Sequence, residues 1–161
     1  MAPNNHKAVK KTVLVVDDDL DIREKVSEML KDAHYNVLTA ATGPSGLRVS
    51  QRFKGEIQVL VSDFLTEGIS GIDLASAITV DRPKLKVLLM SAFPKGLLVL
   101  NEGWHFLSKP FMASQLCALV ETLANPDKVS RFANLETAEL GDVKPPRLSP
   151  EISRYKASQE K

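Results

Sequence analysis

Short apolar runs recur along the chain, and they limit its possible folds more than any other feature. Each run is largely apolar at consecutive positions and is too short to be a helix. The runs are Thr12–Val16, Val37–Ala40, Val59–Val61, Val87–Met90 and Trp104–Leu107. A strand that is apolar at every position is buried on both faces, as in a parallel sheet between two layers of helices. The pattern therefore predicts parallel strands covered by helices on both faces.

Helical patterns separate these runs. Thr42–Phe53 begins with the helix-start signals Thr and Pro, and Ser70 and Asp73 have the spacing of a capping box. A shorter helix, weakened by glycines, is expected between Phe93 and Trp104. In two further segments the apolar residues recur at helical spacing: Ile22, Val26, Met29, Leu30 and Ala33, and Leu116, Leu119, Val120 and Leu123.

This alternation of strands and helices predicts the topology of the sheet. Because crossovers between parallel strands are right-handed, we expect an α/β fold with a doubly wound, five-stranded parallel sheet. The expected strand order is 2-1-3-4-5, which is the flavodoxin-like order. In such a sheet the ligand crevice lies at the carboxyl ends of the first and third strands.

Composition divides the chain into three parts. Residues 1–11 are predicted to be a flexible basic N-terminus, and residues 12–124 to be the folded domain. Residues 125–161 are predicted to be a C-terminal extension with a possible helix and a proline-containing arm. Apolar side chains in the extension need a packing partner, so we predict a homodimer formed through it. They are Val129, Phe132, Leu135 and Leu140.

Formal charges nearly cancel over the chain. Lys and Arg total 21 against 20 Asp and Glu, and this net charge of +1 lacks the basic excess typical of nucleic-acid binding. The single cysteine, Cys117, cannot form an internal disulfide and is predicted to be a buried small hydrophobe. The sequence has no signal-peptide pattern and no run long enough for a membrane span. We expect a cytoplasmic protein with neither a nucleic-acid nor a membrane partner.

Acidic residues stand at the ends of two of the predicted strands. Asp17, Asp18 and Asp19 follow the first, and Asp63 follows the third, its neighbour in the expected sheet. Two carboxylates about 4 Å apart repel by about 4 kcal/mol at an effective dielectric constant of about 20, so a cation is expected between them. Asp19 is interpreted as a helix N-cap. The other three are then a cage of hard oxygen ligands suited to Mg²⁺.

Two more polar residues follow the last two strands. Ser91 directly follows the fourth run and Lys109 comes two residues after the fifth, so both should lie at the edge that holds the acids. Acids, a hydroxyl and an ammonium group at one edge indicate phosphoryl transfer, because that reaction mainly needs a positioned acceptor and neutralised phosphate charge. An aspartate can itself be the acceptor.

Four motifs in this order make residues 12–124 resemble a response-regulator receiver domain of bacterial two-component signalling. They are "VVDDD", the third-strand acid Asp63, the fourth-strand "SA" and the fifth-strand "KPF". The resemblance implies that Asp63 accepts a phosphoryl group from a histidine kinase or a histidine phosphotransfer protein. It also implies a stand-alone regulator that switches contacts with other proteins and catalyses only its own phosphoryl uptake and slow autodephosphorylation.

The resemblance also assigns roles within the site. Asp18 should bind Mg²⁺ directly and Asp17 mostly through water, while Asp63 and the backbone carbonyl of Leu65 complete the protein ligands. Ser91 should donate a hydrogen bond to the phosphoryl group. Lys109 should pair with the same group, and the peptide bond from Lys109 to Pro110 is expected to be cis.

Three apolar side chains are expected to control the switch and its lifetime. Phe106 takes the position of the switch aromatic, which moves inward as Ser91 turns to the phosphate. Leu65 and Phe93 occupy the two positions that tune hydrolysis in this family. Because neither can orient an attacking water, we expect a long-lived phosphoryl-aspartate.

Two other classes fit parts of the same pattern. The "DDDL" stretch also matches the start of haloacid-dehalogenase-type phosphatases, with Asp17 as nucleophile, Asp19 as acid/base, and Ser91 and Lys109 in order. That interpretation leaves Asp63 without a role and lacks a later acidic pair for Mg²⁺. A pseudo-receiver that docks proteins without phosphorylation is the other alternative, and the complete set of site residues disfavours it.

Overall fold

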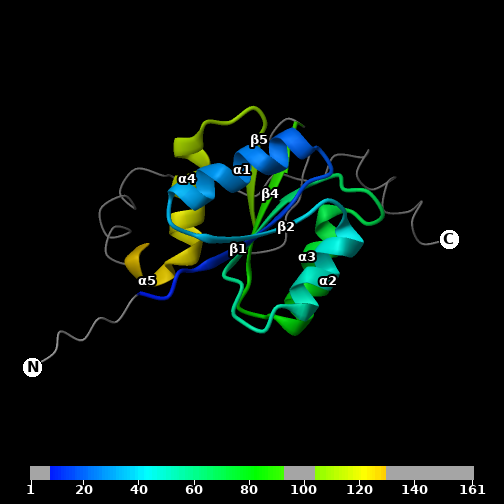
Figure 1. Ribbon diagram of the computed structural model, residues 1–161, viewed down its shortest axis with the longest axis horizontal. Helices are drawn as coiled ribbons and strands as arrows, with labels where there is room; N and C mark the ends of the chain where they lie inside the picture. The colour runs from blue at the N-terminus through cyan, green and yellow to red at the C-terminus, as the bar shows by residue number, and fades with distance from the viewer. Residues whose placement is uncertain (1–7, 93–103, 130–161) are drawn as a thin grey trace, which may run out of the picture.

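A five-stranded parallel sheet organises the chain (Figure 1). The computed structural model describes residues 8–92 and 104–129. The strand order is β2-β1-β3-β4-β5, which confirms the predicted doubly wound α/β fold. The strands coincide with the predicted apolar runs or extend them slightly. They are β1 (Thr12–Val16), β2 (Asn36–Ala40), β3 (Val59–Asp63), β4 (Lys86–Ser91) and β5 (Trp104–Ser108).

Helices cover both faces of the sheet. Helices α1 (Leu20–Asp32) and α4 (Ala113–Ala124) lie on one face, and α2 (Gly43–Arg52) and α3 (Gly71–Asp81) lie on the other (Figure 1). A short helix, α5 (Pro126–Val129), follows α4. Within the described segments, no helix combines the length and the apolar character that a membrane span requires.

Several predictions lie outside the described residues. The helix expected between Phe93 and Trp104 is among them, as is most of the extension after residue 124. The dimer predicted through that extension therefore stays a prediction.

Two apolar cores explain why the central strands contain runs of consecutive apolar residues. On β1, Val13 and Val15 pack toward α1 and α4, whereas Leu14 and Val16 pack toward α2 and α3. All four side chains are fully buried. The edge strands β2 and β5 are only partly buried, contrary to the predicted burial of every strand on both faces. An edge strand has a neighbour on one side only, so the helices cover it incompletely.

The helix boundaries follow the predicted start signals. Asp19, Thr42 and Ser70 are the N-caps of α1, α2 and α3, and each side chain accepts a hydrogen bond from a backbone N–H of the first turn. Two details differ from the sequence pattern. Ala33 is exposed at the C-cap of α1. Cys117 is only partly buried, and its Sγ lies 3.7 Å from the Met29 carbonyl oxygen of α1.

One polar contact joins β2 to α4. The hydroxyl of Tyr35, which is buried next to the start of β2, donates a hydrogen bond to Glu121 Oε2 at 2.8 Å. This bond, together with the ammonium group of Lys128, lowers the pKa of Glu121. A carboxyl group with a lower pKa in the folded state stabilises the fold at pH values above its unfolded-state pKa. This stability is lost as the pH falls through the folded-state pKa.

Tyr35→Phe is therefore expected to destabilise the fold in a pH-dependent way. At pH 7 the loss should be about 1 kcal/mol, since Glu121 is exposed and solvent weakens the bond. The melting temperature should fall by about 4 °C. Thermal unfolding followed by circular dichroism from pH 7 to pH 3 should show the difference shrinking as Glu121 becomes protonated. A difference that stays constant with pH would contradict this account.

Candidate functional site

Three acidic side chains meet at the carboxyl edge of the sheet. Val16 of β1 pairs with Ser62 of β3, so the residues that follow, Asp17 and Asp63, are neighbours across the two strands. Asp18 comes next in the turn toward α1. One carboxylate oxygen from each of the three acids lies within 4.8 Å of the others. The structure thus brings together the acids that the sequence placed at strand ends.

A lysine amino group lies between two of these carboxylates. Lys109 Nζ is 3.0 Å from Asp17 Oδ2 and 3.0 Å from Asp63 Oδ1. The backbone N–H of Lys109 donates to the Ser91 carbonyl at 2.8 Å, which continues the pairing of β4 and β5 and fixes the lysine at this edge. The peptide bond from Lys109 to Pro110 is cis, in agreement with the prediction. Lys109 therefore supplies the cation that the repulsion between the acids requires.

Burial shapes the charge states of this cluster. The side chain of Asp17 is only 1% exposed, and those of Asp63 and Lys109 are 16% and 18% exposed. Burial raises the pKa of Asp63, Lys109 lowers it only in part, and the charges of Asp17 and Asp18 raise it further. Burial acts to lower the pKa of Lys109, but its hydrogen bonds to Asp63 and Asp17 outweigh burial and raise it. The ammonium group is thus held in its charged form.

Backbone contacts hold the turn after β1. The N–H of Asp19 donates to Asp17 Oδ1 at 2.9 Å, and the N–H of Asp17 donates to the Ala40 carbonyl at 3.3 Å. Asp19 Oδ1 accepts bonds from two N–H groups at the start of α1, which confirms its predicted role as N-cap. Asp18, in contrast, is exposed. The turn therefore fixes Asp17 in the interior and leaves Asp18 accessible at the edge.

The segment after Asp63 is held close to the sheet. The N–H of Phe64 donates to the Met90 carbonyl at 2.8 Å, and the N–H of Gly71 donates to the Phe64 carbonyl at 2.9 Å. A Cβ atom at Gly71 would lie 2.3 Å from the carbonyl oxygen of Asp63, so only glycine fits there. The start of α3 thus packs directly against the backbone of Asp63.

The other predicted site residues differ in their exposure. Ser91 is buried at the end of β4, beside β5. Leu65 is 52% exposed in the loop after Asp63. Phe106 is partly buried and packs against the core on the side of α2 and α3. Phe93 lies outside the described residues.

Two residues that the motifs do not single out also shape the site. Gly71 allows the close approach of α3, and its only sequence signal is its place after the cap Ser70. Arg23 Nη1 donates to the backbone carbonyl of Asp17 at 2.7 Å. An arginine on an amphipathic helix is usually solvated, so its sequence position alone does not indicate this contact.

The donor set fits a hard divalent cation. Three carboxylates and one ammonium leave a formal charge of −2 when all are ionised, and oxygen ligands are those that Mg²⁺ prefers. Asp17, Asp18 and Asp63 are the residues that would hold such an ion.

Comparisons with known proteins agree on one family. A family model described as the response regulator receiver domain matches residues 13–121. The probable transcriptional regulatory protein TcrX of Mycobacterium tuberculosis is 28% identical over 147 residues, which cover 89% of this chain and 62% of that protein. The sensor kinase CckA of Brucella abortus is 28% identical over 116 residues, which cover 70% of this chain and 12% of that protein. The chain thus spans less than two thirds of either relative.

A solved structure supports the same grouping. The crystal structure of a response regulator receiver domain protein from Clostridium thermocellum matches with a TM-score of 0.66 and 26% sequence identity. The match covers 74% of this chain and 98% of that one. The similarity therefore extends over nearly all of that structure and leaves out about a quarter of the present chain.

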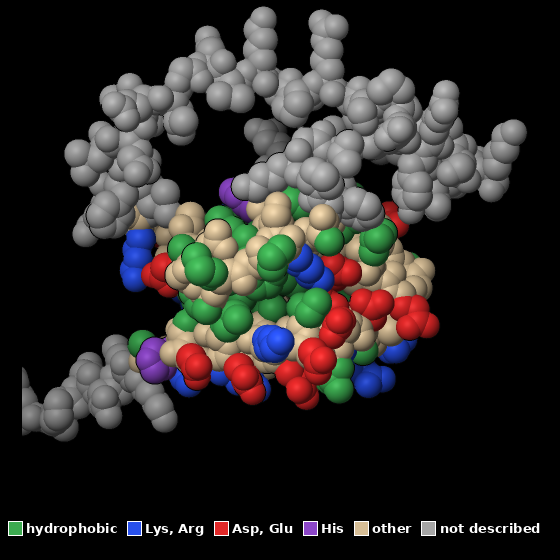
Figure 2. Space-filling view, turned by 90° about the horizontal axis from the view of Figure 1, so that it is seen from above, with side chains coloured by type: hydrophobic (Ala, Val, Ile, Leu, Met, Phe, Trp, Pro, Cys, Tyr) green, Lys and Arg blue, Asp and Glu red, His purple; other side chains and the backbone are tan. Residues whose placement is uncertain are grey.

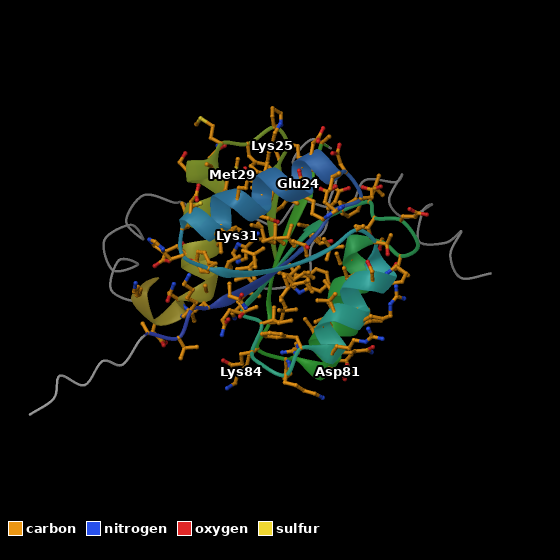
Figure 3. All side chains as sticks on the ribbon, in the orientation of Figure 1. Glu24, Lys25, Met29, Lys31, Asp81 and Lys84 are labelled. Carbon is orange, nitrogen blue, oxygen red and sulfur yellow. The ribbon has the colours of Figure 1, made fainter. Side chains whose placement is uncertain are left out.

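Mg²⁺ is expected to stabilise the protein through the acidic cluster. At about ten times its Kd the ion should add about 1.4 kcal/mol, which raises the melting temperature by about 4 to 6 °C. Thermal unfolding with Mg²⁺ and with NaCl of equal ionic strength measures the shift. Asp18→Asn should remove most of it. Asp81→Asn is the matched control, because Asp81 lies at the far end of α3 (Figure 3), and it should leave the shift unchanged.

Asp63→Asn tests the electrostatic part of the same account without metal. The pKa of Asp63 is raised in the folded state, so its protonated form stabilises the fold at pH values below the unfolded-state pKa. This stabilisation is lost as the pH rises through the folded-state pKa. At neutral pH the ionised side chain is therefore destabilising, and the variant should melt a few degrees higher than the wild type. A flat response to both Mg²⁺ and Asp63→Asn would contradict an assembled acid cluster.

Proposed function

The chain belongs to the response regulator receiver domain family, and we propose that Asp63 accepts a phosphoryl group from a histidine kinase or a histidine phosphotransfer protein. One observation carries the proposal. The carboxylate of Asp63 is bonded to Lys109 at 3.0 Å and lies within 4.8 Å of the carboxylates of Asp17 and Asp18. An acceptor, a cation and a metal-binding pair are thus adjacent, as phosphoryl transfer requires.

The proposed reaction transfers one phosphoryl group between two proteins. A carboxylate oxygen of Asp63 attacks the phosphorus of a phosphohistidine, a P–O bond forms, and the P–N bond to the imidazole breaks. The leaving imidazole keeps the electron pair of that bond and takes up a proton. Lys109 pairs with the transferred phosphoryl oxygens, and Ser91 donates a hydrogen bond to one of them. Bound Mg²⁺ would neutralise phosphoryl charge in the same site.

Phosphorylation is proposed to change protein contacts through a population shift. Ser91 turns toward the phosphoryl group, and Phe106 moves further inward from its partly buried position. The output is then a changed contact with another protein or with a second copy of this chain through residues 125–161. The protein acts as a switch that turns over only its own phosphoryl group.

The phosphatase alternative has less support. It needs Asp19 as an acid/base, whereas the carboxylate of Asp19 accepts two hydrogen bonds from the start of α1. It also gives no role to Asp63, whose carboxylate is paired with Lys109 and lies beside those of Asp17 and Asp18. The pseudo-receiver alternative makes no use of the Lys109 contacts.

Labelling with acetyl phosphate distinguishes the three functions. With Mg²⁺ present, the wild type should take up one acid-stable, base-labile phosphoryl group, and Asp63→Asn should take up none. Asp17→Asn should still be labelled, although more slowly, because its main loss is metal affinity. Intact-protein mass spectrometry measures the product. Label lost only in Asp17→Asn would favour the phosphatase, and no label in the wild type would favour the pseudo-receiver.

Leu65→Asn is expected to shorten the lifetime of the phosphoryl group. The amide can orient an attacking water, which the exposed apolar side chain of Leu65 cannot. We expect hydrolysis to be about tenfold faster, which equals about 1.4 kcal/mol of barrier. Loss of label from the purified phosphoprotein gives the rate. Leu65→Met is the matched control and should leave it unchanged; equal rates in all three proteins would contradict the prediction.

A further inference from the structure

Arg23 makes a contact with the site that the proposed function does not use. Its guanidinium Nη1 donates to the backbone carbonyl of Asp17 at 2.7 Å, and its side chain is partly buried. The backbone of Arg23 is already fixed inside α1, with its N–H bonded to the Asp19 carbonyl and its own carbonyl accepting from Ser27 Oγ. The side-chain contact is therefore an addition to the helix and is not needed to form it.

The position of this cation is unusual for a helix. Arg23 lies near the N-terminus of α1, where the partial positive charge of the helix end disfavours a cation. Its side chain bends back toward that end, in the direction that helical side chains favour. Most exposed charges of α1 are acidic, and Figure 2 shows a row of acidic side chains on the face seen from above. Arg23 is partly buried and, among the described residues, forms no ion pair with an acid, so its bond to the Asp17 carbonyl indicates a specific use of that carbonyl.

The Asp17 carbonyl belongs to the peptide unit that joins Asp17 to Asp18. The other side of Asp17 is fixed to the sheet by its N–H, which donates to the Ala40 carbonyl. Arg23 thus sets the rotation of the peptide that leads into Asp18, the exposed member of the acid cluster. We propose that Arg23 is a positioning residue of the metal site, which holds this peptide so that Asp18 points toward Asp63. The inference rests on the proposed function, because it assumes that the cluster binds Mg²⁺.

Electrostatics and positioning predict opposite effects when Arg23 is replaced. A guanidinium near the site repels a divalent cation, so removing its charge should tighten Mg²⁺ binding if charge alone matters. If Arg23 positions Asp18, its removal should weaken binding, because groups that orient metal ligands typically change affinity by about tenfold or more. The sign of the change therefore separates the two roles.

Mg²⁺ titrations of the full chain test the proposal. The Kd is measured by isothermal calorimetry well below the melting temperature, and unfolding in EDTA shows that each variant is folded. Arg23→Met should raise the Kd about tenfold. Arg23→Lys, which keeps the charge but not the length or the planar group, should give an intermediate Kd. Lys25→Met is the matched control, because Lys25 is an exposed cation on the same helix (Figure 3). The Kd of this variant for Mg²⁺ should equal that of the wild type or be slightly lower.

Acetyl phosphate labelling completes the test. Saturating Mg²⁺ should restore the labelling rate of Arg23→Met to near that of the wild type, because only metal affinity is affected. An equal or tighter Kd in Arg23→Met, with normal labelling of wild-type Asp63, would overturn the positioning role and leave the proposed function intact. A wild type that neither binds Mg²⁺ nor accepts the phosphoryl group would overturn both.

Discussion

Three carboxylates at the carboxyl edge of the sheet share a single ammonium group, and this charge imbalance governs the chemistry of the site. Lys109 bonds Asp17 and Asp63 at 3.0 Å each, which leaves the cluster with a formal charge of −2. Burial raises the pKa of Asp63, Lys109 offsets this only in part, and the charges of Asp17 and Asp18 raise it further. Such a cluster is stabilised by whatever adds positive charge or removes negative charge. A divalent ion would do the first, and under the proposed function it would also neutralise the charge of an incoming phosphoryl group.

The parallel sheet makes this concentration of charge possible. Each strand of such a sheet ends at the same edge, so residues far apart in sequence are adjacent there without any special loop. The apolar layers on both faces fix the strands, and the backbone bonds from Phe64 to Met90 and from Lys109 to Ser91 extend that order one residue beyond the strands. Gly71 allows the start of α3 to pack against the backbone of Asp63, and Arg23 donates a hydrogen bond to the backbone carbonyl of Asp17. The energy that assembles the acids thus comes from burial of apolar side chains elsewhere in the fold.

Local sequence patterns were sufficient to predict most of the fold and to identify the members of the acid cluster. The strands appeared as apolar runs because both faces of a central parallel strand are buried, and the caps Asp19, Thr42 and Ser70 appeared because they satisfy N–H groups within three residues. The incomplete burial of β2 and β5 could not be read in the same way. The expected strand order already placed both strands at the edges, but how completely the helices cover an edge strand depends on how those helices dock.

The sequence by itself determined the strands, the helix starts and the residue types that stand at strand ends, because these depend on side-chain periodicity and on contacts within one turn. Only the tertiary structure decided which of those residues touch. The pairs of Lys109 with Asp63 and with Asp17 are separated by 46 and 92 residues. The contacts of Arg23 with the Asp17 carbonyl and of Gly71 with Asp63 depend on how two elements dock. Docking follows from the packing of whole helix and sheet surfaces, and no local pattern specifies such packing to within a hydrogen-bond length.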